Sequence, residues 1–168
     1  MRSFLLIVDA VIDLANPDGI LGSPSGSFRV DGIVMACDEG RTNTVSGVTV
    51  RTGRRGVVAT GGRLEMTGCS VFYSTDRCLD VASAPGSGIS GCLLFTGTGQ
   101  PVRIDAGSPD TRLDDCLVMR TLSSAAARRT TPVSIDLAAD RVQVCDCAIV
   151  NQSNVAITWA GSFGVCSG

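Results

Sequence analysis

The chain has 168 residues, of which 44% are hydrophobic and 18% are charged, so it holds enough apolar side chains for one compact domain. It contains no histidine, and all 14 of its basic residues are arginine, which excludes His-based acid–base catalysis, Ser-His-Asp and Cys-His nucleophiles and imidazole zinc sites. The net charge of −2 argues against a nucleic-acid partner, and no apolar run is long enough for a membrane partner. Twenty glycines favour a β protein over a helical bundle.

The first element is an apolar N-terminal segment. Its polar residues Asp9, Asp13 and Asn16 fall at i, i+4 and i+7, which is one stripe of an amphipathic helix. The β-branched residues in its first half also allow a strand, so helix and strand both stay open for residues 4–15. Because the two aspartates interrupt the apolar run, we interpret the segment as mature protein and not as a secretion signal. We expect residues 1–27 to cap one end of the core or to anchor another subunit.

One short pattern recurs along the rest of the chain, as VDGIVM, VSGVTV, MTGCSV, ISGCLL, LDDCLV and VCDCAI. It predicts one buried column made of Ile33, Val48, Cys69, Cys92, Cys116 and Cys147. It predicts a second column made of Met35, Val50, Val71, Leu94, Val118 and Ile149. The residues just before the first column are Gly32, Gly47, Gly68, Gly91, Asp115 and Asp146. Left-handed backbone is easy for glycine and tolerated by aspartate, so we expect the chain to turn a corner at each of them.

A second apolar pattern follows the first and reads GVVAT, CLDVA, PVRID, PVSID and NVAIT. Alignment of these copies places Val102 opposite Val133 and stacks Asp105 on Asp136 in adjacent coils. Each unit is therefore expected to hold at least two short strands that bury alternate residues.

Short parallel strands stacked unit on unit, with a coil of roughly 20–25 residues, predict an all-β solenoid. The motifs GCSV, GCLL, DCLV and DCAI resemble those of the right-handed parallel β-helix of the pectate-lyase-like superfamily. The resemblance implies about six short coils over residues 28–160, with residues 161–168 as a C-terminal tail that covers the second open end. An insertion, loop 120–132, is expected on one side of the solenoid, where such proteins often carry function.

Four of the eight cysteines, Cys69, Cys92, Cys116 and Cys147, share the first column. Side chains stacked in register suit a column of buried, reduced thiols better than disulfides. Cys145 and Cys147 form CxC, with no second pair at zinc spacing, so we assign no metal site and no cofactor. Free thiols also favour folding in a reducing host cytoplasm.

The carboxylates are the candidates for catalysis, because β-helix enzymes that cut polysaccharides use clustered acidic side chains. The candidates are Asp105, Asp114, Asp115, Asp136 and Asp146. Asp115 and Asp146 replace glycine at the corner, while Asp105 and Asp136 are expected to cap turns. They form no acidic trio on one outer face, so no catalytic residue is assigned and the chain is expected not to be an enzyme.

The arginines suggest no catalytic role either. Arg103 and Arg112 are the cations nearest to the candidate carboxylates, and neither is expected to pair with an acidic trio. The pairs Arg54–Arg55 and Arg128–Arg129 are expected to be solvated loop charges or contacts at the rim of an interface.

A small β-helix without a catalytic cluster is similar to accessory proteins of bacteriophage particles, which implies a decoration, cement or spike protein of a virion. We therefore expect a non-catalytic structural protein that forms a homotrimer and docks on a capsid or tail protein. The expected contact is the apolar segment Phe4–Leu14, with loop 120–132 at the rim. The alternatives are a polysaccharide-degrading enzyme of the same fold and a glycan- or ice-binding surface module.

Overall fold

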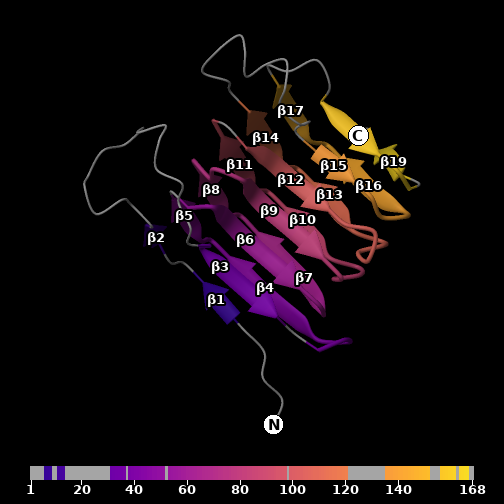
Figure 1. Ribbon diagram of the computed structural model, residues 1–168, viewed down its shortest axis with the longest axis horizontal. Coiled ribbons are helices and arrows are strands. Elements are labelled where there is room, and N and C mark those ends of the chain that lie inside the picture. The colour runs from indigo at the N-terminus through magenta and orange to yellow at the C-terminus, as the bar shows by residue number, and fades with distance from the viewer. Residues whose placement is uncertain are drawn as a thin grey trace.

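The computed structural model describes residues 6–8, 11–13, 31–36, 38–51, 53–97, 99–120, 135–151, 156–161 and 163–166. The described residues form three parallel sheets, A, B and C, which wind together as a solenoid and include no helix (Figure 1). The predicted all-β parallel solenoid is therefore confirmed. None of these residues belongs to a helix that could cross a membrane.

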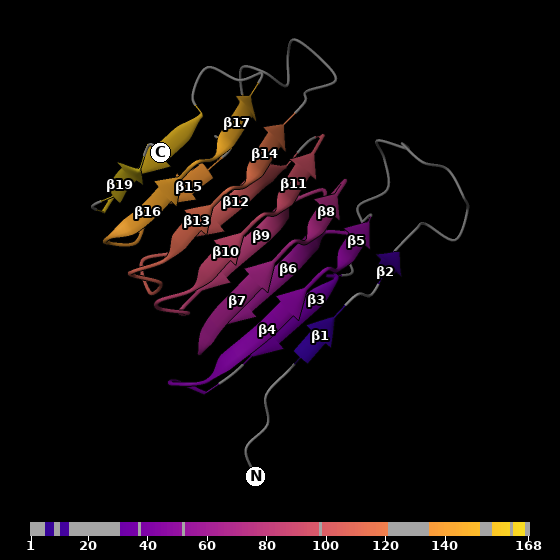
Figure 2. The same ribbon diagram turned by 180° about the vertical axis from the view of Figure 1, so that it is seen from behind.

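Each turn of the chain adds one strand to each sheet, so strands three apart in sequence are neighbours (Figure 2). Sheet A contains β1 (Leu6–Val8), β4 (Thr42–Ser46), β7 (Arg63–Thr67), β10 (Gly88–Ser90), β13 (Arg112–Asp114), β16 (Val142–Cys145) and β19 (Phe163–Cys166). Sheet B contains β2 (Val11–Asp13), β5 (Thr49–Arg51), β8 (Ser70–Phe72), β11 (Leu93–Thr96), β14 (Leu117–Arg120) and β17 (Ala148–Asn151). Sheet C contains β3 (Ile33–Ala36), β6 (Arg55–Thr60), β9 (Arg77–Ala82), β12 (Gln100–Ile104), β15 (Ile135–Leu137) and β18 (Ile157–Trp159). From β4 to β18 the chain completes five turns of three strands, where the sequence indicated at least two strands a turn.

The core lies between the three sheets and consists of inward columns in register. Sheet B contributes Val50, Val71, Leu94 and Val118, each opposite the next and each almost fully buried. This is the second column predicted from the sequence, and Ile149 continues it in β17. Strands this short are stable here because those of the middle turns bury alternate apolar side chains between the three sheets.

The corner between sheets A and B is left-handed in every turn from β4 onward. The corner residues Gly47, Gly68 and Gly91 have φ angles of 64°, 60° and 59°, and Asp115 and Asp146 both have 49°. The prediction of a turn at these positions is confirmed, and the restriction follows from the local clash of a Cβ with the adjacent carbonyl at positive φ, which glycine avoids and aspartate tolerates.

The first copy of the pattern was assigned to the wrong sheet. Ile33 lies opposite Val57, and Met35 lies opposite Ala59, so VDGIVM belongs to sheet C and not to the cysteine column. Gly32 is needed for a different reason, because a Cβ there would lie 2.5 Å from the carbonyl oxygen of Gly56. Alternation of apolar residues shows which side chains point inward, but it does not show which of three sheets they belong to.

Two copies of the second pattern were misaligned by two residues. Val102 lies opposite Ile135 and not opposite Val133, and Ile135 in turn lies opposite Ile157. Consequently Asp136 lies beside Arg103, and it does not stack on Asp105. A shift of two residues keeps the same side chains inside, so the hydrophobic pattern alone could not detect the error.

The N-terminal segment joins the solenoid as strands. β1 pairs with β4 in sheet A and β2 pairs with β5 in sheet B, so the helix interpretation of this segment is wrong for the residues described. At the other end β19 pairs with β16 and extends sheet A. Loop 120–132, apart from Arg120, lies outside the described residues, as do residues 4, 5, 9, 10 and 14 of the apolar segment Phe4–Leu14. The division into residues 1–27, 28–160 and 161–168 stays a prediction.

Candidate functional site

The candidate carboxylates have structural roles. The Asp105 carboxylate accepts hydrogen bonds from the backbone N–H of Ser83 and Gly107, both at 3.0 Å, and from the Ser108 hydroxyl at 3.0 Å, which confirms its role in a turn. Asp136 lies within β15 and accepts a bond from the Thr158 hydroxyl at 3.1 Å, so its expected role as a turn cap is wrong. Within the described residues, no group of three or more cysteine or acidic side chains is placed to hold a metal ion.

The cysteine column forms a thiol ladder, defined as Cys69, Cys92, Cys116 and Cys147 along the A–B corner. Each thiol donates to the carbonyl two residues earlier, over 3.1–3.3 Å, and the Cys147 sulfur accepts from the backbone N–H of Cys116 at 3.4 Å. All four are reduced, as predicted; three are buried, whereas Cys147 at the end of the ladder is only half-buried. The ladder is a packing element of the core.

Two cysteines outside the ladder behave differently from one another. Burial raises the pKa of the Cys78 thiol to about 12, so this side chain is an inert part of the core. Cys145 is disulfide-bonded, which the sequence analysis did not anticipate, and it lies opposite Cys166 in the register of β16 and β19.

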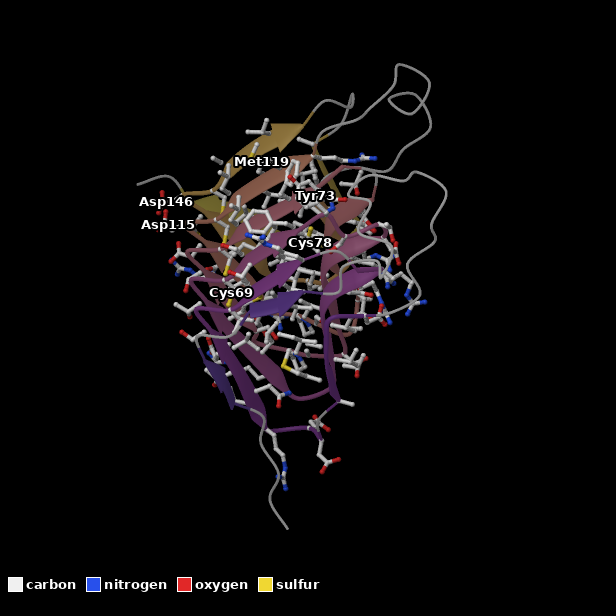
Figure 3. The ribbon with its side chains drawn as sticks, turned by 90° about the vertical axis from the view of Figure 1, so that its left-hand side faces the viewer. Cys69, Tyr73, Cys78, Asp115, Met119 and Asp146 are labelled. Carbon is white, nitrogen blue, oxygen red and sulfur yellow. The ribbon has the colours of Figure 1, made fainter. Side chains whose placement is uncertain are left out.

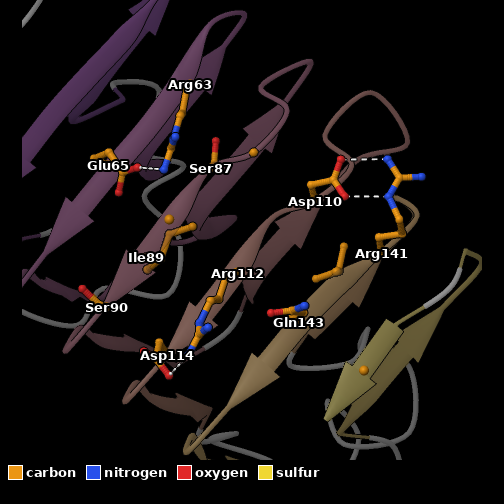
Figure 4. Close-up of a pocket in the computed structure, with 14 residues that line it drawn as sticks. Arg63, Glu65, Ser87, Ile89, Ser90, Asp110, Arg112, Asp114, Arg141 and Gln143 are labelled. Carbon is orange, nitrogen blue, oxygen red and sulfur yellow. Dashed lines mark hydrogen bonds and ion pairs between the residues drawn. The ribbon is translucent and has the colours of Figure 1, made fainter. Parts of the chain in front are cut away.

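The outer face of sheet A carries a charged trough of about 740 Å³ (Figure 4). Its floor lies along β10 and the turn before it, and the Glu65 carboxylate lies over Gly88, where a Cβ would meet it at 2.6 Å. Each arginine of the trough is paired with an acidic side chain. The pairs are Arg63–Glu65, Arg112–Asp114 with 3.2 Å between nitrogen and oxygen, and Arg141–Asp110 with two hydrogen bonds of 2.6 and 2.7 Å. The Arg141 guanidinium holds the pKa of Asp110 below its usual value. The trough is polar and its charges are balanced.

A second charged network lies on sheet C and at its edge. Asp31 binds Arg54 and Arg55 through paired hydrogen bonds of 2.7–3.2 Å, and these arginines hold the pKa of Asp31 well below its usual range. Asp80, almost fully buried, lies 3.1 Å from Arg55 and 3.5 Å from Arg103. Arg54, just before β6, stays exposed while it pairs with Asp31, whereas Arg55 is part-buried, so it is not a solvated loop charge, and it links Asp31 to Asp80 of β9.

Arg120, at the end of β14, is fully buried, and none of its three guanidinium nitrogens has a hydrogen-bond acceptor in the described part of the chain. Burial lowers its pKa. The side chain follows Thr96 in the register of sheet B, and Thr96 donates to the Ser74 carbonyl at 2.6 Å. A cation without an acceptor at this corner is a destabilising feature of the fold.

The outer face of sheet B has a different composition from the other two, and we call it the apolar face. Its small column consists of Ser70, Leu93, Leu117 and Ala148, which lie opposite one another in β8, β11, β14 and β17. Its bulky column consists of Phe72, Phe95, Met119 and Val150 in the same four strands. No charged side chain occupies either column in these strands, and all eight side chains are partly or fully exposed. Charges flank the face: Asp115 and Asp146 lie at the A–B corner (Figure 3), and Arg51 of β5 lies next to Phe72 in register.

Tyr73 extends the bulky column at the end of β8. Its side chain is 54% exposed, and its ring meets that of Phe95 edge-on at 5.1 Å between centroids. Its φ of 60° is left-handed, which is costly for a bulky residue. An exposed aromatic side chain held on strained backbone indicates a recognition role more than a packing role.

The sequence analysis missed the apolar face, although the motifs contained it. GCLLF, DCLVM and DCAIV are runs of apolar residues and not alternations, and continuous runs are typical of strands covered on both sides. The predicted columns contain only the inward residues of these runs.

Comparison with known proteins adds no further information on function. No protein-family model, no curated protein and no solved structure matches this chain. The fold and the three outer faces are therefore the basis for any functional conclusion.

Proposed function

We propose that this chain is a non-catalytic structural protein that self-assembles through the apolar face of sheet B. The observation that carries the proposal is the two uncharged columns running across β8, β11, β14 and β17. Contiguous apolar surface of this kind, beside charged surfaces on the same molecule, marks an interaction site. This contact replaces the N-terminal segment as the surface on which the proposal depends.

The test is the mass of the full-length protein in solution, measured by analytical ultracentrifugation over a range of concentrations. We expect the wild type to associate and Phe95→Arg to remain monomeric, because the new charge would have to be buried unpaired at the contact. Thr44→Arg is the matched control, since Thr44 points outward from sheet A and its substitution should leave association unchanged. A wild type that stays monomeric at high micromolar concentration would remove the proposal.

The expected setting of this assembly is a bacteriophage virion, with docking on a capsid or tail protein. Only the resemblance noted in the sequence supports that setting, and it stays a prediction, as does the homotrimer.

A glycan-binding function is the second candidate, favoured by the charged trough on sheet A. Sugar hydroxyls both donate and accept hydrogen bonds, so they suit a trough in which guanidinium and carboxylate groups alternate. Because each acid there is paired with an arginine, the proposal is binding without cleavage. Retention on immobilised polysaccharides, abolished by Arg112→Ala, would support it, whereas released reducing ends or unsaturated products would show catalysis instead.

A further inference from the structure

The apolar face is shaped for one particular partner. We propose that this partner is a second copy of the chain, packed face to face in parallel, with a twofold axis that runs along the solenoid between the two columns. This inference depends on the proposed self-assembly, adds its symmetry and residue pairs, and puts a dimer in place of the homotrimer expected from the sequence.

The two columns of the apolar face differ in height. In three of the four strands the side chain in the bulky column is larger than its neighbour in the small column: Phe72 beside Ser70, Phe95 beside Leu93, and Val150 beside Ala148. In β14 the two side chains, Met119 and Leu117, are about equal in volume. The apolar face is therefore a ridge beside a step that runs along the solenoid.

Such a surface can pair with a second copy of itself about either of two twofold axes. A twofold axis along the solenoid places the ridge of each copy on the step of the other, strand for strand, so that Phe95 packs on Leu93 of the second copy. A twofold axis along the strands places the bulky column of one copy on the bulky column of the other, with Phe95 on Met119 of the second copy. The two small columns then face each other across a gap. Unfilled space between apolar side chains costs stability, so the parallel arrangement is favoured.

The net charge of the chain and the area of the apolar face determine how strong the contact can be. The net charge of −2 opposes self-association only weakly, and the columns themselves are uncharged. Four strands spaced about 4.8 Å apart make a stripe of limited length, smaller than the roughly 800 Å² per partner of tight complexes. We therefore expect a reversible dimer in the micromolar range. In the parallel dimer both solenoids point the same way, so one end of the assembly presents two identical surfaces.

The test is oxidative cross-linking of the full-length protein with pairs of new cysteines. Ala148→Cys combined with Val150→Cys places each new thiol opposite its counterpart across the parallel interface, so a covalent dimer should form on mild oxidation. Phe72→Cys combined with Val150→Cys would cross-link readily only in the antiparallel arrangement. Thr42→Cys combined with Thr44→Cys has the same two-residue spacing on the outer face of sheet A, and it is the matched control that should remain monomeric.

The outcomes separate this inference from the proposed function. A dimer mass with the first pair cross-linked supports both. A self-associating wild type that cross-links only through the second pair, or that has the mass of a trimer, overturns the parallel dimer and leaves self-assembly in place. A monomeric wild type overturns both, and unfolding of a variant is recognised separately from its circular dichroism spectrum.

Discussion

Sheets A and B share the same backbone geometry and the same spacing between turns, yet their outer faces have opposite chemistry. On sheet A the outward column through the middle of the strands reads Thr44, Glu65, Gly88, Arg112 and Gln143. On sheet B the outward positions of β8, β11, β14 and β17 are uncharged and mostly apolar, and the charge begins only at Arg51 of β5, next to Phe72. The main inward column of each sheet, such as Val45 to Leu113 in sheet A and Val50 to Val118 in sheet B, is apolar, so stability does not require the difference. The difference indicates that sheet A is built to face water and sheet B to face another surface.

The largest expected effect separates the inner and outer sides of one strand. Leu94 is fully buried in β11, so Leu94→Ala should lower the free energy of unfolding by about 2–5 kcal/mol. Its neighbour Leu93 points outward, and Leu93→Ala should cost less than about 1 kcal/mol in dilute, dissociated protein. Urea unfolding measures both. Equal losses would mean that the outer face of sheet B is as buried as its inner face.

The corner that joins the two sheets offers the next test. Cys92→Ser places a hydroxyl where the larger sulfur reaches the carbonyls of Ser90 and Met66, so we expect a loss of about 1–3 kcal/mol. Cys92→Ala is the control that separates lost volume from the cost of the hydroxyl. A Cys92→Ser protein as stable as the wild type would contradict a packing role for the thiol ladder.

A substitution at the end of sheet B should have the opposite sign. Arg120→Met removes a fully buried cation that has no acceptor in the described part of the chain, so the protein should gain about 1–3 kcal/mol. Arg112→Met, on the exposed face of sheet A, is the comparison and should change stability by less than about 0.5 kcal/mol. Thermal unfolding followed by circular dichroism checks both; a less stable Arg120→Met protein would show that the guanidinium is satisfied.

The smallest expected effect is on the pH dependence of the free energy of unfolding, through the ion pairs of Asp31 and Asp110. The folded-state pKa of Asp31 is depressed, so its contribution to stability is present above the unfolded value of about 4 and is lost as the pH falls below it. We expect the unfolding free energy of the wild type to fall more steeply below pH 4 than that of Asp31→Asn. Asp110→Asn, in the exposed pair on sheet A, should change this slope less. Equal slopes for wild type and Asp31→Asn would contradict the assigned ion pair.

Register was the part of the fold that sequence reasoning handled least well. Five of the six corner residues, all except Gly32, and the column from Val50 to Ile149 were assigned correctly. Glycine and aspartate at a left-handed position and apolar residues three further on leave few alternatives. Sheet C was misaligned because a shift of two residues preserves every inward side chain. The predicted stack of Asp105 on Asp136 was wrong for that reason alone.

The sequence by itself determined the solenoid, its left-handed corners and the thiol ladder, because these depend on local backbone preference and on a repeat that every turn must satisfy. Only the tertiary structure decided which residues face outward together, since outward columns are made of residues more than 20 positions apart and depend on the register of each sheet. The apolar face, the charged trough and the Asp31–Arg55 network are all of this kind. Each arises where neighbouring turns bring together side chains whose contact no local pattern specifies.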